Sequence, residues 1–365
     1  MKINILLPHK EQFDKSKLSS VCITVINNLK YSKFKKEIRV FGRQVSDPAR
    51  LENFVGIRNS FNFFKSKNLN LADEMCKYIL SDFDKNQLIE IHNRPKLLSH
   101  VLKKTKNKYP VNIFFHNNPL DMGGSKTFKE RQYIIKNANA ILCVSKFVRD
   151  KFLTDFKNIP ENIHVLYNGV DRKIAKFPKK INEVLFVGRL VKEKGVELYI
   201  NAVAKLATKS PNWKFCIVGS SHLGVSKEKS DFARKITKIF LNIGNQAYFS
   251  GYLSHEEVQK KMMHASIVVV PSIWEEPYGL VVAEAMSNGA AIITNFSGGI
   301  PEIIGSNGIV IKNISQKKLE EALSLILKDK KELYKYQQLS WKNFKHTSLK
   351  SSKKLDLIRS RILNS

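Results

Sequence analysis

Cysteine, acidic residues and long hydrophobic runs are all scarce in this sequence of 365 residues. The four cysteines lie far apart and form no C-x-x-C pair, so the usual zinc and redox motifs and a disulfide framework are all missing. They are Cys22, Cys76, Cys143 and Cys216. Each lies in a segment predicted as strand or helix, and we therefore expect buried free thiols in a reducing cytoplasm.

Long apolar segments are also missing. The longest runs, such as Ile267–Pro271, fall far short of the roughly 20 residues that a membrane-spanning helix needs. The N-terminal segment 1–10 has a short apolar run and no small-residue cleavage site, so we expect a first β-strand rather than a signal peptide. Hydrophobic residues make up 43% and charged residues 26%, which is typical of a soluble globular chain with room for two domains.

Acidic residues are outnumbered by basic ones, with 32 Asp and Glu against 62 Lys and Arg, a formal net charge of +30. The excess is divided evenly between residues 1–170 and 171–365, so it is no basic tail. A basic surface of this kind suits an anionic partner such as a membrane face, a nucleic acid or a phosphorylated substrate. A lysine-rich surface without any such partner remains an equal alternative.

Short apolar runs alternate with longer amphipathic ones, which predicts βα units and parallel sheets. Strands are expected at Ile3–Leu7, Ile38–Phe41, Leu88–Ile91, Val111–Phe115, Ala140–Val144, Ile163–Leu166, Val184–Val187, Lys214–Val218, Ala247–Ser250, Ile267–Val270, Ala290–Thr294 and Ile309–Lys312. The fold class is therefore α/β, with two Rossmann-like, doubly wound parallel-sheet domains that face a central cleft. The expected domains are 1–170 and 171–345. A C-terminal helix follows at 346–365, and whether it crosses back to the first domain is left open.

The segment from Pro271 to Glu302 is the most informative part of the sequence. It contains Glu276 and Glu284, separated by Pro277-Tyr278-Gly279, which indicates the start of a helix. The first amides of that helix, at Leu280 and Val281, would point to the ligand and favour a phosphate. Glu284 lies on an otherwise apolar helix, where a carboxylate is costly unless something hydrogen-bonds to it.

Other strand ends carry small or cationic residues. Gly188-Arg189 ends one strand and Lys194 precedes the next helix, so that a diphosphate could be held from two sides. Gly219, Gly251 and Tyr252 end the next two strands, and Ser297-Gly298-Gly299 is a further loop with amides expected to be free. Ordinary βα loops with exposed charges would explain these motifs individually.

Taken together, FVGRLVKEKG and PSIWEEPYGLVVAEAMSNGAAIITNFSGGIPE resemble the C-terminal domain of retaining glycosyltransferases of family 4, which have the GT-B fold. The E-x7-E signature matches at Glu276 and Glu284. The upstream segments IEIHNRP and FFHNNPLDMGGSKTFKERQYIIKNANAILCVSKFVRDKF are similar to bacterial lipopolysaccharide-core transferases of the N-acetylglucosaminyl type.

The resemblance implies that domain 1–170 lies on the acceptor side and that domain 171–345 binds the nucleotide sugar. It also implies a role for each matching residue. Glu284 would bind the ribose, Glu276 the donor sugar, and Arg189 and Lys194 the diphosphate. The nucleotide-sugar site would also include Gly188, Gly219, Gly251, Tyr252, Tyr278, Gly279, Leu280 and Val281. His116, at a strand end of the first domain, matches the histidine expected beside the transferred sugar, with His92 and Arg94 as weaker candidates. A structural histidine in a turn is the alternative for His116.

Three further features need an interpretation. Asp82-Phe83-Asp84 has the D-x-D form of metal-binding motifs in another glycosyltransferase fold, but its position predicts a solvated turn. The family's glycine-rich loop after the first strand is absent here, and Lys17, Ser19 and Ser20 are the only substitutes we can suggest. Phe61–Lys67 interleaves aromatics and lysines, so it is either a membrane or acceptor patch or simply core phenylalanines with exposed lysines.

The sequence thus predicts a metal-independent retaining hexosyltransferase without a cofactor, with a UDP-sugar favoured as donor. The predicted acceptor is a lipid-linked or oligosaccharide glycoconjugate of the envelope, in lipopolysaccharide-core synthesis. Its predicted location is the cytoplasm, and docking on an anionic inner-membrane face stays open. A nucleotide-sugar epimerase or phosphorylase of the same fold is the nearest alternative. A basic nucleic-acid-binding protein is another, disfavoured because the charge follows both domains and no nucleic-acid module is present.

Overall fold

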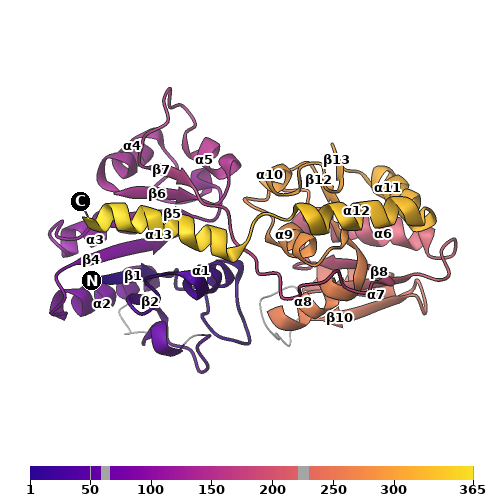
Figure 1. Cartoon of the computed structure of the whole chain (residues 1–365), viewed down its shortest axis with the longest axis horizontal. Helices are drawn as coiled ribbons and strands as arrows, with labels where there is room; N and C mark the ends of the chain where they lie inside the picture. Colours follow the sequence, from indigo (N-terminus) through magenta and orange to yellow (C-terminus); the bar gives the residue numbers. More distant parts are fainter. Residues whose placement is uncertain (50, 59–65, 221–229, 365) are drawn as a thin grey trace. The chain divides into compact units, whose positions relative to one another are not determined.

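The computed structural model describes residues 1–49, 51–58, 66–220 and 230–364 (Figure 1). It forms two compact units, Met1–Gly169 with Ser348–Ser365, and Val170–Thr347. The predicted division after residue 170 differs from this one by a single residue. The C-terminal helix, whose position was left open, belongs to the first unit.

The first unit is built on a seven-stranded parallel sheet in the order β3-β2-β1-β4-β5-β6-β7. Its strands are β1 (Lys2–Leu6), β2 (Ile38–Arg43), β3 (Phe54–Ile57), β4 (Gln87–His92), β5 (Val111–Phe115), β6 (Ala140–Cys143) and β7 (Ile163–Val165). Every pairing between neighbours is parallel. Parallel strands need crossover connections, and the helices between them supply these.

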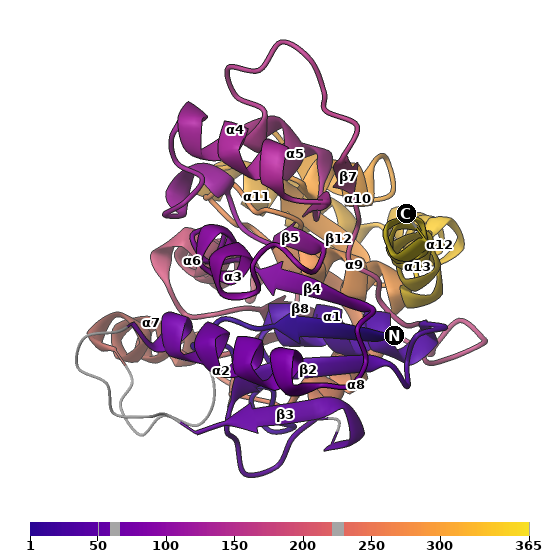
Figure 2. The ribbon, with the colours of Figure 1, turned by 90° about the vertical axis from the view of Figure 1, so that its left-hand side faces the viewer.

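Helices cover both faces of this sheet. They are α1 (Ser20–Tyr31), α2 (Lys67–Ser81), α3 (Leu97–Lys104), α4 (Phe128–Asn137), α5 (Lys146–Phe152) and α13 (Ser348–Asn364). Figure 2 shows α2 and α3 on one side of the stacked strands and α13 on the other. Helices α1 and α13 pack against each other although more than 300 residues separate them. The last helix of the chain thus completes the first unit.

The second unit repeats the plan with a six-stranded parallel sheet in the order β10-β9-β8-β11-β12-β13. Its strands are β8 (Ile181–Val187), β9 (Lys214–Val218), β10 (Ala247–Gly251), β11 (Ala265–Val270), β12 (Ala291–Asn295) and β13 (Ile309–Ile311). Its helices are α6 (Val196–Leu206), α7 (Asp231–Leu241), α8 (His255–His264), α9 (Leu280–Ser287), α10 (Ile300–Ile304), α11 (Gln316–Lys328) and α12 (Lys330–Asn343). The predicted α/β class with two Rossmann-like parallel sheets is confirmed.

All twelve predicted strands are present, but the sequence pattern missed β3. This edge strand has four residues, includes Gly56, and is only half-buried along its length. It therefore lacks the apolar alternation that marks the other strands, and it forms by pairing with β2. Helix α8 begins with a capping box, in which the side chains of Ser254 and Glu257 each accept from the other's backbone amide.

In both sheets the strand order reverses next to the first strand of the unit, between β1 and β4 and between β8 and β11. Ligands of doubly wound folds bind outside the carboxyl ends of the strands at such switch points. The segments to inspect are therefore those that follow β1 and β4 in the first unit and β8 and β11 in the second.

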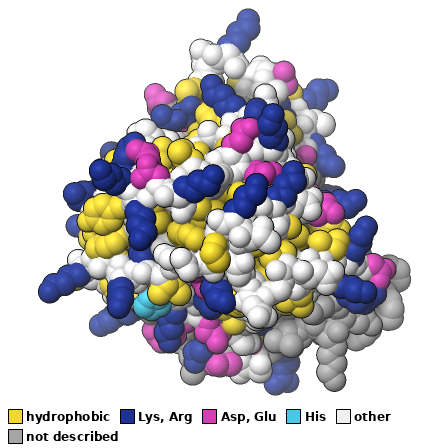
Figure 3. Space-filling model, turned by 90° about the vertical axis from the view of Figure 1, so that its right-hand side faces the viewer, with side chains coloured by type: hydrophobic (Ala, Val, Ile, Leu, Met, Phe, Trp, Pro, Cys, Tyr) yellow, Lys and Arg dark blue, Asp and Glu magenta, His cyan; other side chains and the backbone are white. Residues whose placement is uncertain are grey.

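The cysteines are buried free thiols, as expected, and basic side chains are spread over the surface. All four cysteines are free and buried, and burial raises the pKa of each thiol. Lys and Arg are scattered over the face in Figure 3, among hydrophobic and uncharged side chains. Among the described residues, no helix combines the length and apolar character needed to span a membrane.

Candidate functional site

The segments after β8 and β11 pack tightly against each other at the switch point of the second unit. Gly195 has a φ of 68°, and a Cβ there would lie 1.9 Å from the carbonyl oxygen of Pro271. Only glycine permits so close an approach, so Gly195 sets the distance between the two loops. Lys194, next to it, is thereby placed beside the residues that follow β11.

Lys194 and Glu276, predicted to bind diphosphate and sugar, form an ion pair in this structure. The Lys194 ammonium donates to Oε1 of Glu276 at 2.5 Å, and both side chains are largely buried. The ammonium also lies 5.1 Å from the centre of the Trp274 ring. Lys194 and Glu276 thus hold each other in place in the absence of a ligand. An anion that binds Lys194 would free the Glu276 carboxylate.

Neighbouring residues hold both the side chain and the backbone of Glu276. Ser272 donates its hydroxyl to Oε1 of Glu276 at 2.6 Å, and the amide of Gly299 donates to the carbonyl oxygen of Glu276 at 2.7 Å. Gly298 has a φ of 56°, and a Cβ there would lie 2.1 Å from that same oxygen. The expectation of a free amide is therefore wrong for Gly299, because this loop supports Glu276.

Helix α9 begins as predicted with Gly279 as its N-cap, at a φ of 93°. The amides of Gly279, Leu280 and Val281 have no hydrogen-bond partner in the described part of the chain. These unpaired donors and the helix dipole make the N-terminus an anion-binding position. Tyr278 is buried just before it, edge-on to the His346 ring.

Glu284 is 4% exposed, and its unusual burial is explained by His255, the first residue of α8. Nε2 of His255 lies 2.7 Å from Oε1 of Glu284. Burial lowers the pKa of His255, but the hydrogen bond to Glu284 and its charge outweigh this, so the pKa is raised overall. The pair leaves the second carboxylate oxygen for a ligand.

The remaining predicted residues of the second unit lie at the same sheet edge. Gly219 has a φ of 149°, and a Cβ there would lie 1.8 Å from the carbonyl oxygen of Gly188. Gly251 accepts a hydrogen bond from the amide of Gly219 at 2.8 Å and precedes Tyr252. Arg189 follows β8, and its exposed guanidinium has no partner among the described residues. Their proposed ligand contacts stay predictions.

His116, the candidate of the first unit, is buried and paired with His92. Nε2 of His116 lies 2.9 Å from Nδ1 of His92, and the backbone amide of His116 donates to Oδ1 of Asn93 at 2.8 Å. Burial lowers the pKa of His116 to about 4. Burial, and then the charges of His116 and Arg359, hold the pKa of His92 well below its ordinary value. Both rings are therefore neutral near pH 7.

The loop after β1, where a glycine-rich segment was expected, contains a partly buried carboxylate. Burial raises the pKa of Glu11, while a hydrogen bond with Ser19 and the charge of Arg94 counteract this. Ser19 also caps α1 by accepting from the amide of Cys22. Of the suggested substitutes, Ser19 therefore has a structural role, because it caps α1 and bonds Glu11 within the same loop.

The D-x-D motif at Asp82–Asp84 lies away from the candidate site residues, and most of the aromatic segment Phe61–Lys67 lies outside the described residues. Asp82 ends α2 and pairs with Arg39, Asp84 pairs with the N-terminal amine, and Phe83 between them is 97% exposed. The D-x-D motif is thus a surface turn tied by ion pairs. The aromatic segment Phe61–Lys67 lies, up to residue 65, outside the described residues.

Three site residues were missed by the sequence reasoning: His255, Ser272 and Trp274. Ser272 and Trp274 lie inside the informative segment after β11, so their positions gave a usable signal. His255 follows the strand end at Gly251 and opens a capped helix, which is also a site position in parallel sheets. Its link to Glu284 depends on tertiary packing.

Two family models match adjacent parts of the chain. The model described as Glycosyltransferase Family 4 matches residues 32–173, and the one described as Glycosyl transferases group 1 matches residues 169–340. Between them they cover the greater part of both sheets. Each of the two units of the chain thus matches a model of a glycosyltransferase domain.

Among the curated relatives, an uncharacterized glycosyltransferase of Methanocaldococcus jannaschii is 30% identical over 194 residues, 53% of this chain and 50% of that protein. A lipopolysaccharide 1,2-N-acetylglucosaminetransferase of Salmonella typhimurium is 31% identical over 121 residues, 33% of this chain and 32% of that protein. The chain thus matches about half the length of the first relative and less of the second.

The solved structure of Anabaena HepE in complex with UDP and glucose superimposes with a TM-score of 0.78. The sequence identity is 17%, and the match covers 99% of this chain and 100% of that one. At this identity the likeness establishes the fold, and that fold is GT-B.

Proposed function

We propose that this chain is a family 4 retaining hexosyltransferase that takes its sugar from a nucleotide diphosphate sugar. One observation supports this most directly: two buried glutamates, Glu276 and Glu284, flank a helix N-terminus with unpaired amides, and the Lys194 ammonium pairs with Glu276. Carboxylates accept hydrogen bonds from sugar hydroxyls, and neighbouring N–H groups donate to phosphate oxygens. Together they are the complement of a sugar joined to a diphosphate.

Each group has a distinct role in this proposal. Glu284, oriented by His255, accepts from the ribose hydroxyls. The diphosphate binds the α9 amides, Arg189 and Lys194, and so draws Lys194 away from Glu276. Glu276 then accepts from hydroxyls of the donor sugar. The competition between phosphate and Glu276 for Lys194 couples donor binding to formation of the sugar site.

The transfer itself follows from this charge distribution. The bond between the anomeric carbon and the phosphate oxygen breaks, and its electron pair goes to that oxygen. The acceptor hydroxyl oxygen bonds to the anomeric carbon on the same face, and its proton goes to the departing phosphate. The Lys194 ammonium, the Arg189 guanidinium and a helix N-terminus stabilise the developing charge, so we propose that neither a metal nor a cofactor takes part.

The donor and acceptor are proposed from the relatives and the surface charge. HepE is described with UDP and with UDP-glucose, which favours a UDP-sugar here. The Salmonella relative acts on lipopolysaccharide, and the basic surface suits a phosphorylated or lipid-linked envelope acceptor at the cytoplasmic membrane face. This proposal places the chain in the cytoplasm, in lipopolysaccharide-core or related synthesis.

A thermal-shift screen of UDP-, GDP-, ADP- and dTDP-sugars tests the donor. A ligand present at 100 times its Kd stabilises the folded state by about 2.7 kcal/mol, so the melting temperature should rise for UDP-sugars. Arg189→Ala should then lower turnover on the order of 100-fold, because one donor to the leaving phosphate is lost.

Arg234→Ala is the matched control, since Arg234 is also exposed and forms an ion pair with Asp231, three residues earlier on α7. Product analysis by NMR reads the configuration of the new glycosidic bond. Wild-type turnover in Arg189→Ala, or an inverted product, would contradict the proposal.

A further inference from the structure

His92 is an unusual residue at the end of β4, because one of its nitrogens is engaged and the other is not. It is 2% exposed, and its ring stacks on Phe114 with centroids 4.2 Å apart and planes 8° from parallel. Nδ1 faces Nε2 of His116, while Nε2 of His92 is buried without a partner among the described residues. A buried polar atom of this kind needs an explanation.

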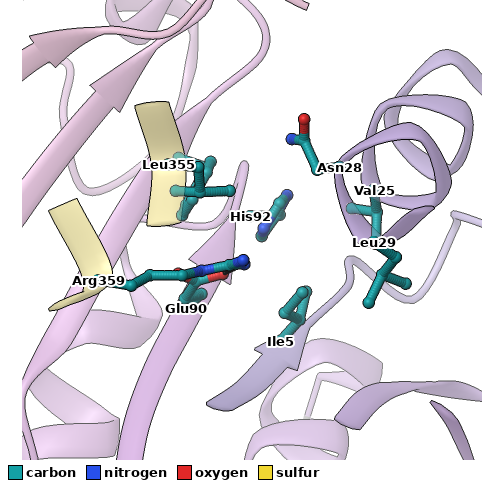
Figure 4. A pocket seen from close by; sticks show the side chains of 9 residues that line it. Ile5, Val25, Asn28, Leu29, Glu90, His92, Leu355 and Arg359 are labelled. Carbon is teal, nitrogen blue, oxygen red and sulfur yellow. Dashed lines mark hydrogen bonds and ion pairs between the residues drawn. The ribbon is translucent and has the colours of Figure 1, made fainter. Parts of the chain in front are cut away.

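A small cavity beside the ring supplies one. Its volume is about 10 Å³, and Glu90, His92, Phe114 and Arg359 are among the residues that line it. Figure 4 shows the His92 ring next to the Arg359 guanidinium, with Asn28 from α1 on the other side. This volume is on the order of what one water molecule needs. A water there can accept from the guanidinium and donate to a lone pair on Nε2.

The charges around the cavity determine which His92 nitrogen bears the proton. Arg359 comes from α13 and donates to both oxygens of Glu90, at 2.9 and 2.7 Å, and its other side approaches Asp356 at 3.3 Å. Both Glu90 oxygens are therefore occupied and make a poor acceptor for a histidine N–H. A guanidinium has donors only, so the neighbouring Nε2 is favoured as an acceptor. The proton of neutral His92 then resides on Nδ1.

We propose that His92 is a positioning residue that fixes the tautomer of His116. Its Nδ1–H donates to Nε2 of His116, which must be unprotonated to accept. Neutral His116 then carries its proton on Nδ1, for which the described residues offer no partner. Resting on the proposed function, this makes His116 a fixed N–H donor to a hydroxyl oxygen of a bound sugar.

The first test measures the tautomer directly and needs no substrate. In the full-length protein labelled with ¹⁵N-histidine, His116 should appear as the Nδ1–H tautomer near pH 7. In His92→Leu, which has no donor, the Nε2–H form should become populated. His116 protonated at Nε2 in the wild type would overturn the proposal.

The second test uses turnover. Asparagine places an amide where Nδ1 lies, and glutamine places it nearer Nε2. We expect kcat to fall on the order of tenfold to 100-fold in His92→Leu and His92→Gln, and much less in His92→Asn. The KM for the nucleotide sugar should change little, because the groups proposed to bind its ribose and diphosphate are in the second unit. Equal kcat losses in all three folded variants, checked by their melting temperatures, would overturn the proposal.

The two experiments separate this inference from the proposed function. If no nucleotide sugar supports transfer while the tautomers behave as stated, the proposed function fails and the positioning role stands. If transfer occurs but the tautomer is the opposite one, the positioning role alone fails.

Discussion

Single glycines in this chain bring backbones together at the site, and Gly279 shows what that contributes. Its φ of 93° turns the chain into α9, and a Cβ would lie 2.8 Å from Cγ1 of Ile300. Gly244 has nearly the same φ, 92°, but a Cβ there would meet nothing within 4 Å. Both glycines have a left-handed backbone conformation that would strain any residue with a Cβ. They differ in whether that Cβ would also clash with a neighbouring side chain.

Gly279→Ala should therefore affect both stability and turnover. Alanine at a left-handed position costs about 1–2 kcal/mol, and the clash with Ile300 displaces the start of the helix. We expect turnover to fall on the order of tenfold or more, because the amides that face the phosphate move. Gly244→Ala should lose similar stability but keep its turnover. The proposed role of the α9 amides would be refuted by equal turnover in the two variants, measured beside urea unfolding.

At the scale of elements, the sequence predicted nearly all strands but not the contacts of the polar, basic residues 172–182 at the start of the second unit. In the structure, Arg172 stacks on Trp341 at 3.7 Å, and Lys180 donates to three backbone carbonyls. Long cationic side chains can bury their stems and satisfy helix ends, which a hydropathy pattern does not reveal.

The candidate site was predictable to a similar degree. Four predicted site residues follow strand ends or lie in the helices that begin there: Glu276, Glu284, Arg189 and Lys194. In a parallel sheet all such positions lie at the carboxyl edge, whatever the side-chain packing. His255 could not be assigned to Glu284 in this way, because their contact joins helices α8 and α9 across 29 positions. Side-chain pairing across elements depends on packing, and periodicity carries little information about it.

Lys180 predicts an effect on the helices that hold the site. Its ammonium donates to the carbonyl oxygens of Met262, Met263 and Asn288, at the C-terminal ends of α8 and α9. Lys180→Met would leave three carbonyls without this donor and should lower stability by about 1–3 kcal/mol. For a unit of this size that corresponds to a fall in melting temperature of roughly 2–4 °C per kcal/mol. Lys260→Met, at an exposed position on α8, is the control and should melt like the wild type. Identical melting of the two variants would show that Lys180 does not support the helix ends.

At the scale of the whole molecule, the chain leaves the first unit at Gly169 and returns to it at Ser348. The return is secured by a buried ion pair between Arg359 of α13 and Glu90 of β4, which are 1% and 0% exposed. Asp356 of the same helix accepts from the Ser32 hydroxyl and the Lys33 amide, both at 2.7 Å. The first unit is therefore incomplete until the last helix has been added.

Arg359→Met should destabilise the first unit specifically. Removing one partner leaves Glu90 buried and uncompensated, which typically costs about 3–5 kcal/mol. The double variant Arg359→Met/Glu90→Met should recover most of this loss, because a well-packed apolar pair can replace a buried ion pair. Arg361→Met, at an exposed position on the same helix, should have little effect.

The three tryptophans make this prediction specific to one unit. Trp213, Trp274 and Trp341 all lie in the second unit, so their fluorescence reports its unfolding, whereas circular dichroism reports both units. In guanidinium titrations of Arg359→Met, the dichroism curve should gain an early phase while the fluorescence midpoint stays in place. A fluorescence midpoint that falls by the same amount would mean that α13 stabilises the molecule through both units, and the assignment of the helix to the first unit alone would have to be abandoned.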